Sequence, residues 1–435
     1  MKNLLVGVGL STKKDSSEAT KEALDKALKS LNNKKPTITY VFFTDKHDAY
    51  KVNDTLKNNL KNLEFVGGSC DTVYLNDEVT NEGVLVVSLY SEYMHVGVSS
   101  VDNASKNPYD AAKKVMMDSL KNIPIDKYVD PYVMFTRMKN SPVSWMVKIP
   151  SFYVTVFRRG IKLPNMGDEA EVIRGISDVI GLQVPIWGGS FGVEAMKVLR
   201  GEPYEIYMIH SGKVMKDGLI VIFNTTSLMY SYSIEHGCEP TNTCGFISKT
   251  SNNGYVVEEI SNKNIIDWYA EVLKMKKEDV LKNVQLITQL NPIGAPNYLG
   301  DYTLRGGGIP AGKGLAYVIP LNEGWPVYLM KGRSENLLTA SDKIKNQIQT
   351  YVRSKEAPAI ALTNMCVTRQ LVYQAEKTEL KKELVKIRKA LGNPVLVGFT
   401  CFGEIGAKPG RQTMFQNENL NVFVIYDKLM TQLKE

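Results

Sequence analysis

Residues 66–70 read Val-Gly-Gly-Ser-Cys and close a short apolar strand. The pattern returns as Trp-Gly-Gly-Ser-Phe at residues 187–191 and, in weaker form, as Val-Gly-Phe-Thr-Cys at residues 397–401. Glycine has no Cβ and tolerates positive φ, so a strand that contains it can lie unusually close to a neighbouring backbone or a ligand. Three such glycine-rich breaks predict three related units, in which the break is a repeated joint between closely packed sheets and loops.

The order helix, strand, helix, glycine-rich strand, strand recurs around the three breaks. In the first copy, apolar patterns predict strands at residues 4–10, 37–43, 65–69 and 84–90. Strands that follow one another without an intervening helix imply antiparallel pairing. We therefore predict the α/β class with α+β character: several layers of mixed, largely antiparallel sheets flanked by helices and built from repeated helix-strand-helix-strand-strand units.

The pattern changes near Asn224-Thr225-Thr226, and we place a domain boundary there. Residues 1–225 are expected to form an N-terminal domain of two related units, about 1–100 and 106–225. Residues 226–435 are expected to form a C-terminal domain. Within the second unit, residues 204–209 and 219–223 are expected to be the two strands of a hairpin, with no counterpart in the first unit.

The 435 residues are 43% hydrophobic and carry a net charge of +7. The lysines are scattered among acidic residues and form no dense basic stripe, which argues against nucleic-acid binding. No apolar stretch reaches membrane-spanning length, and the apolar start runs into Lys13-Lys14 without a signal-cleavage site. Five cysteines in a long chain are typical of a reducing compartment. We predict a soluble cytoplasmic protein without a membrane or nucleic-acid partner.

Two motifs resemble functional sites but lack essential residues. Residues 307–313 fit the start of a Walker A loop, but Gly314 replaces the magnesium-binding Ser or Thr and a strand pattern follows. His236, Cys238 and Cys244 match no standard zinc spacing. With both motifs incomplete, we assign no catalytic or metal-binding residue.

A dense polar cluster follows the third break. It begins at residues 400–404, and Arg411 and Asn417 come after it, while Cys366 and Arg369 end the neighbouring strand at 359–365. An arginine can hold a carboxylate in a bidentate pair, Glu404 can accept from an amine, and exposed glycine N–H groups add donors. The predicted ligand-binding residues are Arg305, Cys366, Arg369, Thr400, Cys401, Gly403, Glu404, Arg411 and Asn417, with Gly68, Ser69, Gly189 and Ser190 from the first two breaks. In the alternative interpretation, Arg369 and Glu404 form an internal ion pair that orders the loops.

The chain resembles the FIST family along almost its whole length. The start at residues 7–11, the alanine-rich helix after it and the first Gly-Gly-Ser break resemble the FIST N-terminal domain. The C-terminal half resembles the FIST C domain in four motifs, which are Tyr302–Arg305, Asn322–Gly324, Cys366–Arg369 and Gly398–Glu404. The order and spacing of these motifs carry the resemblance.

The resemblance implies a sensory input module that binds small ligands such as amino acids in signal transduction. Because no kinase, cyclase or methyl-accepting output domain follows in this sequence, we expect signalling through a separate protein partner. The closing motif of the family usually reads His-Asn-x-Thr, whereas residues 416–419 read Gln-Asn-Glu-Asn. The missing histidine argues against a metal or haem role at that position.

Two other functions remain as alternatives. The resemblance also implies haem-dependent nitric oxide sensing in some members, for which the axial ligand would be one of four histidines: His47, His95, His210 or His236. An enzyme would use Cys401 or Cys366 as a nucleophile, with Arg369 lowering the thiol pKa, but no histidine is placed in sequence as its base. The sequence favours a cofactor-free, ligand-binding sensor over an enzyme.

Overall fold

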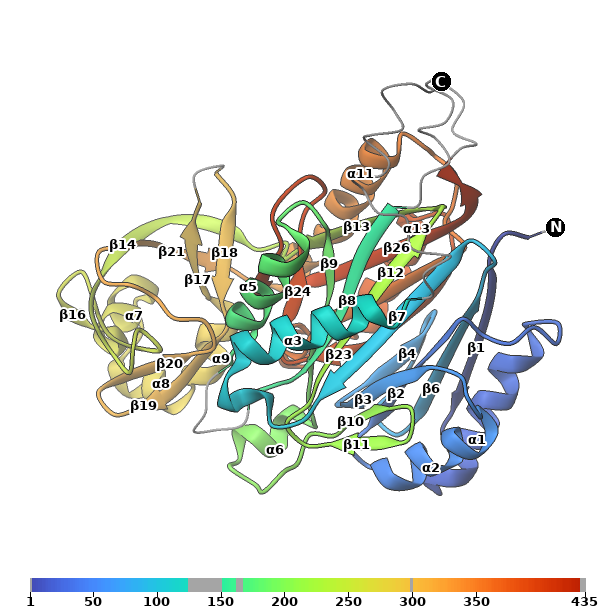
Figure 1. The fold of residues 1–435 in the computed structure, drawn as a ribbon. Coiled ribbons are helices and arrows are strands. Elements are labelled where there is room, and N and C mark those ends of the chain that lie inside the picture. Colours follow the sequence, from blue (N-terminus) through green and yellow to red (C-terminus); the bar gives the residue numbers. More distant parts are fainter. Residues whose placement is uncertain (1, 124–150, 162–166, 298–299, 431–435) are drawn as a thin grey trace.

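The computed structural model describes residues 2–123, 151–161, 167–297 and 300–430. It contains 30% helix and 38% strand. Within the described residues the strands form four sheets, flanked by helices. Three sheets make up a main body, and the fourth stands to one side of it, on the left in Figure 1. The predicted α/β class with mixed sheets is confirmed.

The first sheet carries its helices on one face and turns its other face to the centre of the body. Its elements are β1 (Leu5–Ser11), α1 (Ser16–Lys29), β2 (Ile38–Thr44), α2 (Ala49–Asn59), β3 (Phe65–Cys70) and β6 (Val84–Tyr90). The strand order is β1-β6-β2-β3, and only β2 and β3 run in parallel. This parallel pair needs a crossover, which α2 supplies. The side chains of Asp15 and Asp48 cap the first turns of α1 and α2.

Two further sheets have the same pattern of pairing. The second is built from β7 (Met94–Val101), α3 (Pro108–Lys121), β8 (Ser151–Arg159), α5 (Glu169–Ile180), β9 (Ile186–Phe191) and β12 (Leu219–Thr226). The third is built from β13 (Leu228–Glu235), α10 (Ser334–Leu337), α11 (Ala340–Val352), β22 (Ile360–Cys366), α12 (Val367–Ala375), α13 (Lys381–Ala390), β23 (Val395–Cys401) and β26 (Leu420–Leu429). Their strand orders are β7-β12-β8-β9 and β13-β26-β22-β23, and in each the last two strands run in parallel.

After each glycine-rich strand, the chain leaves its own sheet and adds a hairpin to another one. The hairpins are β4 (Val73–Leu75) with β5 (Glu78–Thr80) on β23, β10 (Met208–His210) with β11 (Lys213–Met215) on β3, and β24 (Glu404–Gly406) with β25 (Met414–Gln416) on β9. The exchange is cyclic, so each sheet receives a hairpin from one neighbour and gives one to the other. It ties the three sheets together through main-chain hydrogen bonds.

The hairpin predicted for residues 204–209 and 219–223 is wrong. Residues 208–210 pair with 213–215, while β12 crosses into the second sheet between β7 and β8. The β10–β11 hairpin also has a counterpart in the first unit, β4–β5. Glycine marked the turn correctly, but the partner of β12 is set by packing between segments distant in sequence, which no local pattern reports.

The glycines at matching places in the three breaks touch the carbonyl oxygens of the parallel neighbouring strand. A Cβ added to each glycine would meet that oxygen far inside van der Waals contact. The distance from the added Cβ would be 1.7 Å from that of Gly67 to Val41 O, 1.8 Å from that of Gly188 to Val156 O and 2.1 Å from that of Gly398 to Thr363 O. Any side chain there would force the two strands apart, so these glycines determine how closely the strands can pack.

The inner faces of the three sheets meet in an aromatic core. Phe42 of β2 stacks on Phe399 of β23 with 4.4 Å between ring centroids, and Phe157 of β8 stacks on Phe191 of β9 at 5.1 Å. All four rings are buried. Alternate residues of β2, such as Val41, point instead toward α1 and α2. The space between the three glycine-rich strands is therefore filled with side chains, and a ligand has to bind elsewhere.

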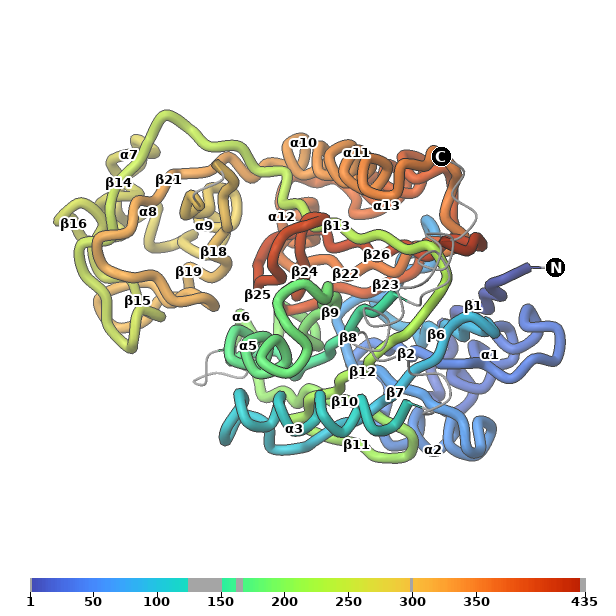
Figure 2. The backbone as a smooth tube through the Cα atoms, turned by 45° about the horizontal axis from the view of Figure 1, so that its top comes forward, coloured from blue at the N-terminus to red at the C-terminus, as the bar shows by residue number. Residues whose placement is uncertain are grey.

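The fourth sheet and its helices form a lobe inserted between β13 and α10. Its elements are β14 (Glu239–Ser251), β15 (Val256–Ile260), β16 (Lys263–Asn264), α7 (Ile265–Leu273), α8 (Lys277–Lys282), α9 (Val284–Leu290), β17 (Ile293–Pro296), β18 (Tyr302–Arg305), β19 (Gly307–Ala311), β20 (Gly314–Tyr317) and β21 (Pro326–Lys331). Figure 2 shows this lobe beside the body, with α10, α11 and α13 grouped together on the body. Residues 307–313 lie in the β19–β20 hairpin, and β20 follows them where a strand pattern was predicted. Among the described residues, we find no helix long and apolar enough to cross a bilayer.

Candidate functional site

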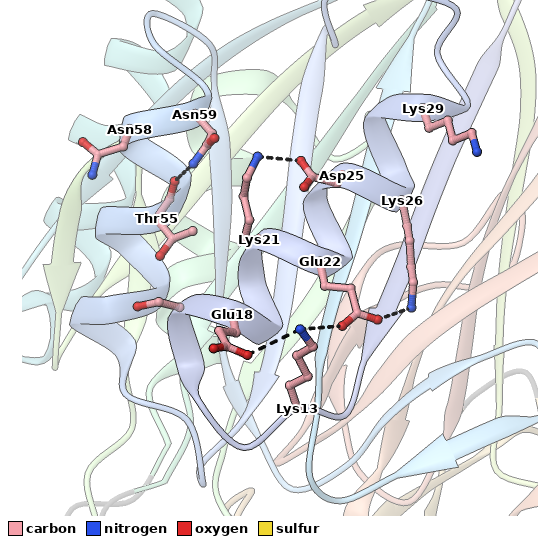
Figure 3. Close-up of a pocket in the computed structure, with 11 residues that line it drawn as sticks. Lys13, Glu18, Lys21, Glu22, Asp25, Lys26, Lys29, Thr55, Asn58 and Asn59 are labelled. Atoms are coloured by element: carbon pink, nitrogen blue, oxygen red, sulfur yellow. Dashed lines mark hydrogen bonds and ion pairs between the residues drawn. The ribbon is translucent and has the colours of Figure 1, made fainter.

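A wide groove of about 770 Å³ lies over the outer surface of α1 and α2. Figure 3 shows that its charged side chains reach one another: Lys21 contacts Asp25 at 2.7 Å, and Lys26 contacts Glu22 at 2.6 Å. These side chains are exposed pairs of the kind worth about 0.3–0.5 kcal/mol each on a helix surface. The groove has the properties of a solvated helix face, and the more enclosed cavities of the molecule are better candidates for a ligand site.

A cavity of about 140 Å³, which we call the polar cavity, lies where the lobe meets the body. Residues 234–236 at the end of β13, residues 301–303 at the start of β18 and side chains from residues 407–419 line it. An engineered cavity of about 150 Å³ holds a benzene molecule. The polar cavity thus has room for a molecule of roughly that size.

Charged groups of both signs face the polar cavity. Lys408 Nζ lies 3.0 Å from Glu235 Oε1 and 2.9 Å from Asp301 Oδ1. Burial opposes the charge of Lys408, but the two carboxylates outweigh it and raise its pKa. Arg411 is exposed at the cavity, and its guanidinium forms no ion pair within the part of the chain that the structure describes.

The polar cavity is also lined by residues with unpaired acceptors. Nε2 of His236 lies 3.1 Å from the carbonyl oxygen of Tyr302, so this nitrogen carries the proton and Nδ1 is a bare acceptor. Burial, together with the nearby cations Lys343 and Lys408, lowers the pKa of His236 to about 3, so the ring is neutral. Nδ1 of His236 and Oδ1 of Asn419 are buried and have no hydrogen-bond partner among the described residues. Each unpaired group costs about 1–3 kcal/mol, which a suitable donor would recover.

Arg369 is part of the framework around this cavity. It is 1% exposed and forms an ion pair with Glu383. The remaining donors bond to main-chain carbonyls, including those of His236 at 2.6 Å and Glu418 at 2.9 Å. Arg369 therefore fixes two segments next to the polar cavity but has no donor left for a ligand. The alternative interpretation named Glu404 as its ion-pair partner, whereas that partner is Glu383.

Glu404 and the two strand cysteines form a buried cluster outside the polar cavity. Cys401 Sγ donates to Glu404 Oε1 at 3.1 Å, and the N–H of Asn419 donates to Oε2 at 2.9 Å. Burial raises the pKa of Glu404 to about 8. It also raises the pKa values of Cys401 and Cys366, which lie opposite each other in β23 and β22, well above that of a free thiol. Protonated thiols are poor nucleophiles, so this environment does not favour the cysteine-enzyme alternative.

The residues predicted from the first two breaks, with Thr400 and Gly403, belong to the joint between sheets. Ser69 donates to the carbonyl of Gly192, Ser190 to the carboxyl of Glu169, and Thr400 Oγ1 accepts from the N–H of Thr72. The glycines lie against other groups: Gly68 against the ring of Phe191, Gly189 against Asn364 and Gly403 against the ring of Phe415. None of these six residues lines either of the enclosed cavities described here.

Arg305 is a buried cation without a carboxylate. It is 8% exposed, its Nε has no hydrogen-bond partner, and no ion pair of it is found among the described residues. Burial lowers the pKa of Arg305 to about 10. Side chains alternate along a strand, so Arg305 lies on the same face of β18 as Thr303, which lines the polar cavity.

The structure therefore separates the predicted site residues into groups. Arg411 lines the polar cavity, while Cys366 and Asn417 line a second cavity of about 100 Å³ next to α12, which we call the junction cavity. The pattern did not indicate the residues that join Arg411, which are Glu235, His236, Asp301 and Lys408. They come from three distant segments, and the only sequence signal was the pair of adjacent polar residues that ends an apolar strand at 235–236.

Family models match most of the chain. The FIST N domain matches residues 37–263, and the FIST C domain matches residues 266–407. No curated protein matches the chain in sequence. The predicted resemblance to both FIST domains is confirmed.

Solved structures resemble the chain only distantly. Cyanuric acid hydrolase from A. caulinodans aligns over 97% of this chain and 99% of its own, with 6% identity and a TM-score of 0.39. A second cyanuric acid hydrolase structure gives the same coverage and identity with a TM-score of 0.34. PurLQS from Thermotoga maritima aligns over 82% of this chain and 74% of its own, at 9% identity and a TM-score of 0.21. With the two domain models covering its sequence, the chain belongs to the FIST family, whose domains are small-ligand sensory domains of signal transduction.

Proposed function

We propose that this protein senses a small zwitterion or carboxylate, such as an amino acid, bound in the polar cavity, and signals through a separate protein partner. The observation that carries the proposal is the combination at one cavity of an arginine and buried acceptors that have no partner among the residues the structure describes. Arg411 supplies the first, and His236 Nδ1 and Asn419 Oδ1 supply the second. A guest with a carboxylate at one end and an amine at the other would satisfy both.

The two ends of such a guest have separate partners. The planar guanidinium of Arg411 can hold a carboxylate through two parallel hydrogen bonds. An ammonium group can donate to His236 Nδ1, which is neutral and fixed as an acceptor by the carbonyl of Tyr302. The carboxylates of Glu235 and Asp301 also line the cavity, where both contact Lys408.

The location of the cavity suits a sensor. A guest there touches the end of β13, residues 301–303 of the lobe and the segment at 407–419 of the body. Binding would therefore link the lobe to the body and favour the arrangement in which these three segments come together. The polar and junction cavities are both smaller than the roughly 300–1,000 Å³ pockets that hold larger ligands, which supports a small guest over haem.

Thermal-shift screening against amino acids and small carboxylates tests the proposal. A true ligand at 100 times its dissociation constant should stabilise the fold by about 2.7 kcal/mol. Arg411→Ala should abolish that shift and leave the ligand-free protein nearly as stable, because Arg411 is exposed. Arg200→Ala is the matched control, since Arg200 is exposed and its ion pair among the described residues is a surface pair with Glu202 at 3.4 Å. A library without a single hit, or a shift that survives Arg411→Ala, would contradict the proposal.

A further inference from the structure

The junction cavity differs in character from the polar cavity. It lies where the start of α12 meets α6 (Ala195–Leu199) and the β19–β20 hairpin of the lobe. Most of its wall is apolar, with contributions from Val198, Leu199, Ile309, Val318, Leu371 and Phe402. An apolar wall with few convergent polar groups is typical of a small-molecule site.

One buried amide of this wall has an oxygen without a partner in the described part of the chain. Asn417 is 2% exposed, and its Oδ1 has no hydrogen bond within the described residues. Gly306 packs against its side chain so closely that an added Cβ would lie 2.9 Å from Asn417 Cβ. The amide is therefore held in place at the cavity, with an acceptor available.

The start of α12 supplies donors at the same cavity. The first N–H groups of a helix have no partner within the helix. Cys366 is the N-cap residue, and its thiol, a weak acceptor, is the side chain that interacts with Thr368 at this helix start. Val367 and Thr368 of the first turn line the cavity together with Asn417. The polar end of the cavity thus offers both an acceptor and donors.

We propose that the junction cavity binds a short, mainly apolar molecule with a neutral amide or hydroxyl head. A carboxylate head would face the unpaired Oδ1 of Asn417, and an ammonium head would face the positive end of α12. A neutral head that donates and accepts matches both groups. The cavity has about two thirds of the volume of the roughly 150 Å³ cavity that holds benzene, so it suits a guest of about four carbons, with any carbon of the head included.

Three probes with a chain of four carbons in all and different heads test this site: butyramide, butyrate and butylamine. Titration calorimetry on the full chain should give saturable binding of butyramide at least tenfold tighter than that of the two charged probes. Asn417→Leu should weaken butyramide binding about tenfold, the effect of losing one hydrogen bond of about 1.4 kcal/mol. Equal affinity for all three probes, or tighter binding of butyrate, would overturn the proposal.

Two substitutions that fill the cavity locate the bound probe. Val198→Phe and Leu371→Phe place a ring in the space from α6 and from α12, and either should abolish butyramide binding. Melting curves show which of the two variants is folded, and retained binding in a folded one would refute the site. Arg411→Ala is the control, because Arg411 lines the polar cavity and does not line the junction cavity. This variant should leave butyramide binding unchanged. The outcome therefore does not depend on the ligand proposed for the polar cavity.

Discussion

Glu404 and Arg411 follow the same glycine-rich strand but differ in environment. Glu404 is fully buried and accepts hydrogen bonds from Cys401 and Asn419, and burial raises its pKa to about 8. It is therefore a neutral structural group at neutral pH. Arg411 is exposed at a cavity and has no ion pair among the described residues. At the scale of single residues, burial and partners separate framework side chains from candidate ligand contacts.

The raised pKa of Glu404 predicts how stability changes with pH. Folding raises the pKa of Glu404 from 4.5 to about 8. Between these two pH values the carboxyl keeps its proton in the folded protein and loses it in the unfolded chain. Its contribution to stability therefore falls as pH rises through that range. Glu404→Gln should flatten the fall measured by denaturant unfolding at pH 5, 7 and 9, at a cost of about 1 kcal/mol at pH 5 for one lost acceptor.

The control for that experiment is Glu335→Gln, because Glu335 is an exposed carboxyl on α10. It should leave the pH dependence as in the unchanged protein. Burial also raises the pKa values of Glu169 and Glu418, so part of the fall with pH will persist in Glu404→Gln. An unchanged slope in Glu404→Gln would show that Glu404 titrates normally in the folded chain.

At the scale of elements, the parallel pairs depend on glycine. β2 with β3, β8 with β9, and β22 with β23 each place a glycine against a carbonyl of the partner strand. The crossovers through α2, α5 and the α12–α13 segment bring the two strands of each pair side by side. The glycines then allow the two strands to reach pairing distance. The glycine-rich breaks are thus needed for the parallel pairing of these strands.

Gly67→Ala tests this dependence. Its Cβ would lie 1.7 Å from the carbonyl oxygen of Val41, so β3 must move away from β2. We expect a loss of more than about 4 kcal/mol in the free energy of unfolding, or failure to fold. Gly201→Ala is the comparison: its φ is +66° with nothing within 4 Å, so it should cost only about 1–2 kcal/mol of backbone strain. Similar losses in the two variants would contradict the account.

At the scale of the whole molecule, the lobe has a core of its own, and its residues Leu304 and Met330 also pack in a cluster with body residues such as Leu337. The central core draws residues from all three body sheets, whereas the lobe core contains only residues between Ile247 and Leu329. The cyclic exchange of hairpins further joins the body sheets through the main chain. The body should therefore behave as one cooperative unit and the lobe as a smaller, weaker one.

Hydrogen exchange measured by mass spectrometry in increasing denaturant tests that division. Peptides from β2, β8 and β22 should lose protection together, at one denaturant concentration. Peptides from β15 and β20 of the lobe should lose it at a lower concentration. If all five strands open in a single transition, the lobe and the body are one unit; if the three body strands open separately, the hairpin exchange does not make the body cooperative.

The sequence alone determined the local features of this protein and its family. Alternation of apolar residues indicated the strands, glycine indicated the close approaches and turns, and ordered motifs indicated the FIST resemblance. Only the tertiary structure decided which strand receives each hairpin, that Arg369 pairs with Glu383, and that Arg411 shares a cavity with His236. Strand alternation and turns depend on neighbours a few residues away, so they can be read from the chain. The hairpin pairings and the Arg411–His236 cavity join residues 100 or more positions apart, and Arg369 reaches Glu383 from one helix to the next. Both kinds of contact depend on how sheets and helices pack, and no local pattern specifies that.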